Sequence, residues 1–323
     1  MKYRTLGSTG IEVSEIGFGT WGIGGLSKGP TSYGPTDDKE SVKALQRALD
    51  SGITLYDTSN VYGDGHSEEL LGKTFNKSRD QVIFATKAGY SEHNSFKDFS
   101  PANLRGSLEK SLGRLKTDYV DVYQLHDAST DILETENEII PTLKKLKKEG
   151  KIRAYGISVN SPRDVATAVK VGFPIIQVNF NMIDQRILDN GLIELISKNK
   201  VGLIARTPLC FGFLLGKYRP GMFGKDDHRS TWPLEQQKIW CEAPKLFSGP
   251  AKKEKSTPIE IALRYCLSFP EISSVIPGML SVKEVDENIK AETRGILNKE
   301  TLNEIRTIYK QNTFFVTKNR QLT

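Results

Sequence analysis

The stretch ITLYDTSNVYGDGHSEELLGKTF, residues 53–75, contains one complete strand-then-helix unit. Its opening residues are mostly apolar and β-branched, which is typical of a strand that is covered on both faces. Gly63 and Gly65 indicate a loop, and Ser67 followed by two glutamates is typical of a helix start. A chain built from such units forms a parallel sheet.

Strand-like and helix-like segments alternate eight times along the 323 residues. The strand-like segments are EIGFGT, ITLYDTS, QVIFATK, DYVDVYQLH, KIRAYGIS, PIIQVNFN, VGLIARTPL and ISSVIPG. The clearest helix starts are Asp37-Asp38, Ser100-Pro101, Ser161-Pro162 and Thr257-Pro258. We therefore predict an α/β fold with one domain over residues 1–323, a (β/α)8 TIM barrel. A doubly wound sheet is the alternative.

Two additions to the barrel are predicted. The segments KYRTLG and IEVSEIG flank Ser8-Thr9-Gly10, so we expect an N-terminal β-hairpin that closes the bottom of the barrel. After the seventh strand, about fifty residues precede the helix TPIEIALRY, and a connection of that length is usually functional or mobile. We expect a long loop over residues 218–250, whose role the sequence leaves open.

The composition excludes several classes of protein. The net charge is +6, from 45 basic and 39 acidic residues, but the two signs are interleaved, so we expect no nucleic-acid partner. No segment approaches the roughly 18 apolar residues of a membrane span, and the N-terminus has no apolar signal region. The few cysteines lack metal-type spacing and favour a cytoplasmic location. The oligomeric state is not indicated.

Polar residues stand where successive apolar strands end, and in such barrels the active site lies at these C-terminal ends. Asp57 and Tyr62 follow the second strand, Lys87 ends the third and His126 ends the fourth. A lysine cation lowers the pKa of a nearby tyrosine, a carboxylate holds the lysine in place, and an imidazole can donate to a carbonyl oxygen. This set predicts a proton donor for carbonyl reduction.

Other chemistries were weighed against this one. Lys87 alone could be an ion pair or the Schiff-base lysine of an aldolase-type barrel. No G-x-S-x-G hydrolase motif occurs. GFGTWGIGG matches the letters of a dinucleotide fingerprint, but no helix follows, so we interpret it as the first βα loop. The scattered histidines predict no metal site; they are His66, His93, His126 and His228.

The chain resembles the aldo-keto reductases, in particular their bacterial-type and potassium-channel β-subunit-like branches. The matching stretches are GFGTWGIGG, LYDTSNVYGDGHSEELLG, FATKAG, YVDVYQLH, GKIRAYGISV, IQVNFN, GLIARTPLCFGFLLGKY and VIPGMLSVKEVDEN. The resemblance implies an enzyme that reduces an aldehyde or ketone with NAD(P)H. Tyr62 would be the acid, Lys87 and Asp57 would tune it, and His126 would orient the carbonyl.

The resemblance also implies positions for cofactor and substrate. Thr20 and Trp21 would lie near the nicotinamide, and Trp21, Tyr62 and His126 would contact the substrate. Ser158 and Gln177 would contact the carboxamide, and Arg229 would contact the phosphates. The pyrophosphate and ribose would lie along Arg206, Leu209, Gly212, Leu214 and Lys217. The adenosine end would lie among Gly278, Glu284, Glu287 and Asn288.

This sequence departs from the family pattern at two places. Val159 separates Ser158 from Asn160, where the family often has asparagine directly after the serine, so a carboxamide contact by Asn160 is not expected. Leu280 stands where many members have the arginine that meets the 2′-phosphate of NADPH, and Glu284 would repel that phosphate. NADP(H) is the expected cofactor, with Lys283 or Arg229 compensating, and NAD(H) is the alternative.

Two further questions remain open at the level of sequence. The alternative function is a cofactor-binding regulatory subunit with little turnover. The substrate is expected to be a small carbonyl compound, and its specificity to reside in the loops of residues 27–37, 89–100 and 219–240. Those loops mix aromatic and cationic side chains, which suits a sugar-like or phosphorylated carbonyl; they include Lys28, Tyr33, Tyr90, Phe96, Lys97, Arg229, Trp232 and Trp240.

Overall fold

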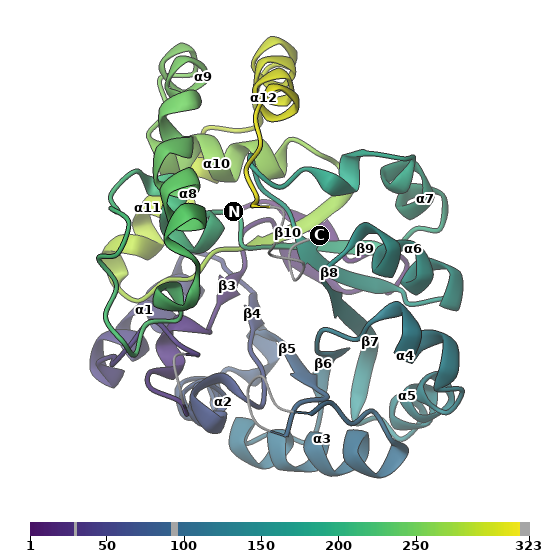
Figure 1. The fold of residues 1–323 in the computed structure, drawn as a ribbon. Helices are drawn as coiled ribbons and strands as arrows, with labels where there is room; N and C mark the ends of the chain where they lie inside the picture. The colour runs from purple at the N-terminus through teal and green to yellow at the C-terminus, as the bar shows by residue number, and fades with distance from the viewer. Residues whose placement is uncertain (29–30, 92–95, 317–323) are drawn as a thin grey trace.

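The computed structural model describes residues 1–28, 31–91 and 96–316 and confirms the predicted barrel (Figure 1). Eight strands lie side by side in chain order, and each adjacent pair is parallel. Parallel bridges from Ile16 to Val275 and from Gly19 to Gly278 join the first strand to the last and close the barrel. The strands are β3 (Phe18–Gly19), β4 (Leu55–Asp57), β5 (Ile83–Ala88), β6 (Val120–Leu125), β7 (Ile152–Val159), β8 (Ile175–Asn179), β9 (Gly202–Arg206) and β10 (Ile272–Ile276).

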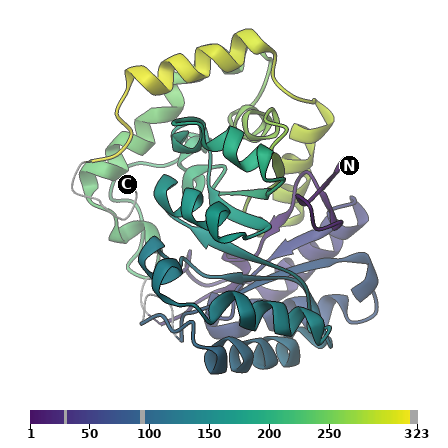
Figure 2. The same ribbon diagram turned by 90° about the vertical axis from the view of Figure 1, so that its right-hand side faces the viewer.

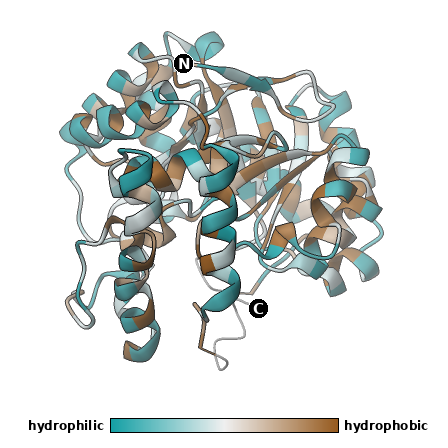
Figure 3. Cartoon of the chain, turned by 90° about the horizontal axis from the view of Figure 1, so that it is seen from above, coloured by the Kyte–Doolittle hydropathy of each residue, from teal (hydrophilic) through white to brown (hydrophobic). Residues whose placement is uncertain are grey.

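Helices surround this barrel on the outside, and their apolar sides face it (Figures 1 and 3). The helices that return the chain between strands, or follow the last one, are α1 (Asp38–Asp50), α2 (His66–Phe75), α3 (Pro101–Leu115), α5 (Ile139–Lys148), α6 (Pro162–Val171), α7 (Leu192–Lys198), α10 (Pro258–Leu267) and α11 (Val282–Thr293). The expected caps are present: Ser161 and Thr257 each form a reciprocal capping box with the acid three residues later. Within the described ranges, no helix is long and apolar enough to cross a membrane.

The N-terminal hairpin closes the bottom of the barrel, as predicted. It consists of β1 (Tyr3–Thr5) and β2 (Glu12–Ser14), which pair in antiparallel fashion. Its turn lies so close to the start of β9 that a Cβ on Gly7 would sit 2.2 Å from the amide nitrogen of Gly202, and Gly7 has a φ of +58°. The guanidinium of Arg4 donates to carbonyl oxygens between the end of α10 and the start of β10, and these belong to Leu267, Phe269 and Ile272.

The connection after β9 is more ordered than the predicted long loop. It contains the 3₁₀ segments Cys210–Leu215 and His228–Thr231, followed by α8 (Leu234–Leu246) and α9 (Ser248–Lys253), so residues 218–250 are a loop only in their first part. Trp240, expected as a loop aromatic near the substrate, has a fully buried side chain in the core. Two further helices, α4 (Thr130–Thr135) and α12 (Lys299–Gln311), add to the barrel, and α12 crosses one end of the side view (Figure 2).

The inside of the barrel has an apolar lower layer. The hairpin residues Leu6, Ile11 and Val13 pack there against inward-facing side chains of the strands. Those strand residues are Leu55, Ala85, Val122, Ala154, Ile175, Ile204 and Ile276. Because inward-facing positions recur every second residue of a strand, the next inward position on each strand lies one layer higher, towards the C-terminal ends.

Candidate active site

A cavity of about 1480 Å³ opens at the C-terminal ends of the strands. Its walls come from the ends of β4, β6, β8, β9 and β10 and from the first, third and seventh βα loops. Pockets for a single small ligand measure roughly 300–1,000 Å³. This cavity therefore has room for a dinucleotide together with a small substrate.

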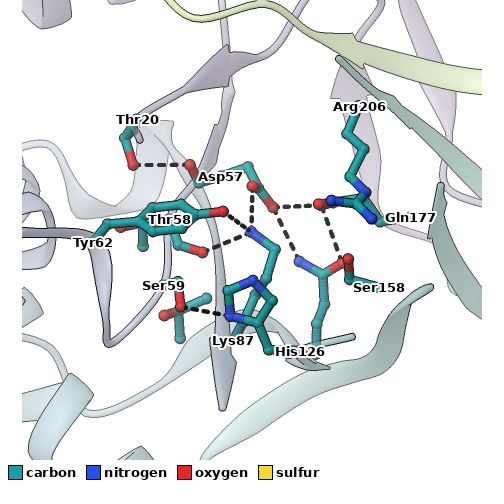
Figure 4. A network of polar contacts seen from close by, with 12 residues as sticks. Thr20, Asp57, Thr58, Ser59, Tyr62, Lys87, His126, Ser158, Gln177 and Arg206 are labelled. Atoms are coloured by element: carbon teal, nitrogen blue, oxygen red, sulfur yellow. Dashed lines mark hydrogen bonds and ion pairs between the residues drawn. The ribbon is translucent and has the colours of Figure 1, made fainter. Parts of the chain in front are cut away.

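Lys87 is the centre of a buried polar network at the base of this cavity (Figure 4). Its Nζ atom lies 2.5 Å from Oδ1 of Asp57, 2.9 Å from the carbonyl oxygen of Thr58 and 3.4 Å from Oη of Tyr62. The side chains of Lys87 and Asp57 are 1% and 3% exposed. Asp57 comes from β4, Tyr62 from the segment after β4, and Lys87 from β5. The structure thus brings these three residues together, as the sequence predicted.

Burial and neighbouring charges act in opposite directions on the pKa values of this network. Burial raises the pKa of Tyr62, and the opposing effect of the Lys87 cation is smaller, so the pKa lies above its ordinary value. The lowering of the Tyr62 pKa by Lys87 that the sequence predicted is present, but burial outweighs it. For Lys87, burial lowers the pKa, but Asp57 and Tyr62 raise it by more. Lys87 is accordingly charged and Tyr62 protonated at neutral pH.

His126 faces the same space from the end of β6. Its ring lies edge-on to that of Tyr62, with 5.9 Å between centroids, and its Nδ1 atom is 3.0 Å from Oγ of Ser59. With the Ser59 hydroxyl donating to Nδ1, the neutral ring carries its hydrogen on Nε2. In that tautomer His126 can donate to a carbonyl oxygen. The fourth predicted residue thus joins the other three.

Two glutamines that hold Asp57 extend the network. Nε2 of Gln177 and Nε2 of Gln124 lie 2.7 and 3.0 Å from Oδ2 of Asp57, the oxygen that does not meet Lys87. Gln177 was expected at the nicotinamide carboxamide, and it lines the cavity as well as binding Asp57. Sequence reasoning missed Gln124. The sequence does place a glutamine within the buried strand β6. Because a buried amide needs hydrogen-bond partners, this position could have indicated a polar contact inside the barrel.

Thr20 and Trp21 follow β3 and line the cavity beside Tyr62. Oγ1 of Thr20 donates to the backbone oxygen of Asp57 at 2.8 Å and accepts from the Ser67 hydroxyl at 2.7 Å, so this side chain fixes the position of β4. The ring of Trp21 lies 6.2 Å from that of Tyr62. Trp21 is thus placed to contact a substrate.

Arg206 lies at the end of β9, close to His126 and Asp127, rather than out along the seventh loop. Its Nη2 atom donates to Oδ1 of Asp127 at 3.3 Å, to the carbonyl oxygen of Val159 at 3.1 Å and to the side-chain oxygen of Asn160. Asn160 is therefore a partner of Arg206. Ser158 Oγ lies 3.4 Å from Asp127. Sequence reasoning missed Asp127, although it directly follows His126 at the end of a strand.

The seventh loop supplies part of the predicted cofactor wall. Leu209, Gly212 and Arg229 line the cavity, and Arg229 is held by Asp227, with 2.6 Å between Nη2 and Oδ2. Two predicted contacts are not supported. Leu214 is 1% exposed and packs into the core, because the 3₁₀ turn directs it inward. Lys217 projects into solvent, outside the lining of the described cavity.

The predicted adenosine end lies at the start of α11. Gly278, Leu280 and Glu284 line the cavity, and Oε2 of Glu284 accepts from the backbone amide of Leu280 at 2.6 Å. Glu287 and Asn288 lie behind this wall rather than in it. Glu287 is 3.9 Å from Nζ of Lys283, and Asn288 is buried; their predicted place around the adenosine end stays a prediction.

The residues present fit a dinucleotide. Within the described ranges, Nε of Arg206 is a buried atom without a hydrogen-bond partner, and Arg206 lines the cavity. A Cβ on Gly278 would approach only the backbone oxygen of Gly19, at 3.9 Å, so backbone is exposed there for close approach of a ligand. A metal is not indicated: no group of three potential ligands occurs among the described residues, and His93 lies outside them.

Fold and site together define a (β/α)8 barrel with an Asp–Tyr–Lys–His group of residues at the C-terminal ends of its strands. The sequence profile of the Aldo/keto reductase family matches residues 15–310, and the chain belongs to that family. Aldo-keto reductase YhdN of Bacillus subtilis is 35% identical over 95% of this chain and 93% of its own, and L-galactose dehydrogenase of Arabidopsis thaliana is 34% identical over 95% and 94%. The structure of aldo-keto reductase AKR11C1 from Bacillus halodurans, holo form, superposes with a TM-score of 0.80 at 28% identity and 99% coverage of both chains. The resemblance seen in the sequence is confirmed, and the chain is an oxidoreductase that uses a nicotinamide cofactor.

Proposed function

We propose that Tyr62 donates the proton when this enzyme reduces an aldehyde or ketone to an alcohol. The observation that carries the proposal is the buried chain of contacts from Asp57 through Lys87 to the phenol oxygen of Tyr62. The nicotinamide cofactor, when bound, supplies a hydride to the carbonyl carbon. Tyr62 then gives its proton to the carbonyl oxygen, and solvent restores that proton.

The neighbouring residues have separate roles in this step. Lys87 stabilises the phenolate that Tyr62 becomes, and Asp57 keeps Lys87 charged and in place. His126 donates from Nε2 to the carbonyl oxygen and so orients the substrate. The same contacts argue against a Schiff-base mechanism. A lysine nucleophile must be neutral, whereas Lys87 donates to three acceptors and its pKa is raised.

We further propose that the enzyme prefers NADH. The N-terminus of α11 would attract the 2′-phosphate of NADPH, but the Glu284 carboxylate already occupies that end through the Leu280 amide. A carboxylate at such a position suits the free 2′-hydroxyl of NADH. Of the two cations expected to compensate, Arg229 is held by Asp227 at 2.6 Å, and Lys283 projects largely into solvent, 3.9 Å from Glu287. NADP(H), expected from the resemblance, becomes the alternative.

The substrate is proposed to be a polar, hydroxylated carbonyl compound. The cavity wall around His126 combines charged side chains, among them Lys97, Asp127 and Arg206, with the aromatic rings of Tyr62 and Tyr90. The name of one relative, L-galactose dehydrogenase, records a sugar as its substrate. The cysteines of the chain are all free and buried, which supports a cytoplasmic setting as part of the proposal.

A Tyr62→Phe variant tests the proposed mechanism. We expect kcat for carbonyl reduction to fall by about 10²–10⁴-fold, because the general acid is lost while the ring is kept. Turnover is followed through nicotinamide absorbance over a panel of aldehydes and ketones with both cofactors, and cofactor affinity through fluorescence titration. Affinity should stay within a few-fold of wild type. Undiminished turnover in Tyr62→Phe would refute the role of Tyr62, and a higher kcat/KM with NADPH would refute the cofactor preference.

A further inference from the structure

Asp127 is a charged residue in the cavity that the reaction above does not use. It directly follows His126 at the end of β6, and both residues line the same wall. Its φ angle is +53°, a left-handed conformation that few residues other than glycine adopt. The backbone therefore turns sharply after His126. Tyr90 links the two side chains: its ring centroid lies 5.1 Å from that of His126, and its Oη atom lies 3.5 Å from Oδ2 of Asp127. The Asp127 carboxylate therefore faces the same part of the cavity as the imidazole, close to a carbonyl bound at His126.

The carboxylate of Asp127 has long contacts with the residues around it. Nη2 of Arg206 and Oγ of Ser158 lie 3.3 and 3.4 Å from Oδ1, and Oη of Tyr90 lies 3.5 Å from Oδ2. Hydrogen bonds to a carboxylate normally measure about 2.7–2.9 Å, and its two oxygens offer about four acceptor sites. These neighbours leave Asp127 with capacity to accept shorter hydrogen bonds from a ligand.

The environment of Asp127 combines a charged acceptor with charged donors. Burial alone would raise the pKa of Asp127, but Arg206, His126 and Lys97 outweigh it and hold the pKa below its ordinary value. Lys97, from the third βα loop, donates to the backbone oxygen of Asp127 at 2.6 Å and lines the cavity. An anionic acceptor and a cationic donor thus stand side by side next to His126.

We propose that Asp127, assisted by Lys97, is a substrate subsite that binds hydroxyl groups on the carbons next to the carbonyl of an uncharged polyhydroxylated aldehyde or ketone. A hydroxyl can donate to Asp127 and accept from Lys97, so vicinal hydroxyls satisfy both groups. A phosphate or carboxylate at that position would be repelled by the negative charge of Asp127. An alkyl group would bury Asp127 without a partner. This inference rests on the proposed carbonyl reduction.

The test compares two three-carbon aldehydes, glyceraldehyde and propanal, which differ in the two hydroxyl groups. We expect kcat/KM of the wild-type enzyme to be higher for glyceraldehyde. In Asp127→Asn, kcat/KM for glyceraldehyde should fall by about 10- to 100-fold, the effect of one hydrogen bond to a charged group, while the value for propanal stays close to wild type. Lys97→Met should lower the same preference by a smaller factor. The control Asp131→Asn changes an acid whose side chain is 85% exposed and should leave both values unchanged.

A binding measurement separates this subsite from the reaction itself. Glycerol and propan-1-ol are titrated into the complex with reduced cofactor, and the change in cofactor fluorescence is followed. Glycerol should bind more tightly than propan-1-ol in wild type, and Asp127→Asn should remove the difference. If neither aldehyde is reduced but glycerol still binds through Asp127, the subsite is supported and the proposed reaction fails.

Three results would overturn the subsite. An equal loss of kcat/KM for both aldehydes in Asp127→Asn would mean that Asp127 acts on His126 or on the cofactor. Glycerol binding that does not depend on Asp127 would remove the hydroxyl contact. Faster reduction of glyceraldehyde 3-phosphate than of glyceraldehyde would show that the subsite accepts an anion. Melting curves of each variant identify any loss of folding.

Discussion

The lower and upper layers of the barrel interior are built from the same strands and have opposite chemistry. In five of the strands, a step of two residues leads from an apolar to a polar side chain, as from Leu55 to Asp57 in β4 and from Ala85 to Lys87 in β5. The remaining steps from apolar to polar are Val122 to Gln124, Ile175 to Gln177 and Ile204 to Arg206.

One strand can therefore contribute to stability with one inward-facing residue and to the site with the next. The lower layer is apolar and sealed by the hairpin, so it gains free energy by excluding water. The upper layer buries charges and amides, which is costly unless every group has a partner. Asp57 meets this condition through Lys87, Gln124 and Gln177. Substitutions in the two layers should therefore affect different measurements.

The largest effect is expected from Lys87→Met in the upper layer. The variant removes the cation that stabilises the Tyr62 phenolate, so kcat for reduction should fall by about 10²–10⁴-fold. Cofactor binding, measured by fluorescence titration, should persist. A matched control is Lys43→Met, which removes an exposed lysine on α1 and should leave kcat unchanged.

The pH dependence of kcat/KM in Lys87→Met should shift in a defined direction. Reduction needs protonated Tyr62, whose pKa burial raises and Lys87 partly lowers. In wild type, kcat/KM should therefore hold across neutral pH and fall only at alkaline pH. Without Lys87 the pKa of Tyr62 should rise further, so the residual activity should fall at a higher pH. A shift towards lower pH would contradict the role given to Lys87.

The next effect is expected from Ile175→Ala in the lower layer. Its fully buried side chain packs under the site, so truncation leaves a cavity and should lower the free energy of unfolding by about 2–5 kcal/mol. The kcat of the folded variant should stay near wild type. Urea unfolding followed by fluorescence measures the first quantity. Ile296→Ala, at a 60% exposed position, should change stability by less than about 0.5 kcal/mol.

The smallest of these effects is expected from Gln124→Leu. This variant removes one of the two amide donors on Oδ2 of Asp57 but keeps the volume of the side chain. A hydrogen bond to a charged group contributes about 1.5–3 kcal/mol, and Gln177 retains part of the restraint, so we expect kcat to fall by about 10-fold. KM should change little, because Gln124 meets no substrate. A change confined to KM would place Gln124 at the substrate instead.

Much of the fold could be predicted from sequence, because alternation of strand-like and helix-like segments is a local signal. The caps at Ser161 and Thr257, the hairpin and the eight units all follow from short patterns. The helices after β9 could not be predicted as well. Residues 234–246 include a run of polar residues and Pro244, so the pattern resembles a loop until Trp240 and its neighbours pack into the core.

The site was predictable where a residue's role depends on its place in the barrel. Asp57, Lys87 and His126 stand at strand ends, and that position alone brings them together. The net effect on the pKa of Tyr62 could not be predicted, since it depends on the balance between burial and the Lys87 charge. Asp127 was missed because its importance comes from spatial neighbours on other segments, Lys97 and Arg206.

The position of the hairpin, packed between the start of β9 and the start of β10, limits the order in which the chain can fold. Arg4 binds carbonyl oxygens as far as 268 residues further along the chain, and β3 can close the barrel only against β10. During synthesis the first segments leave the ribosome long before their partners exist. The hairpin strands can pair with each other, and β3 can pair with β4, but Arg4 and the outer edge of β3 have no partners until β10 is made. Contacts of such sequence separation form slowly. During synthesis the chain is thus most exposed to aggregation before β10 has been made.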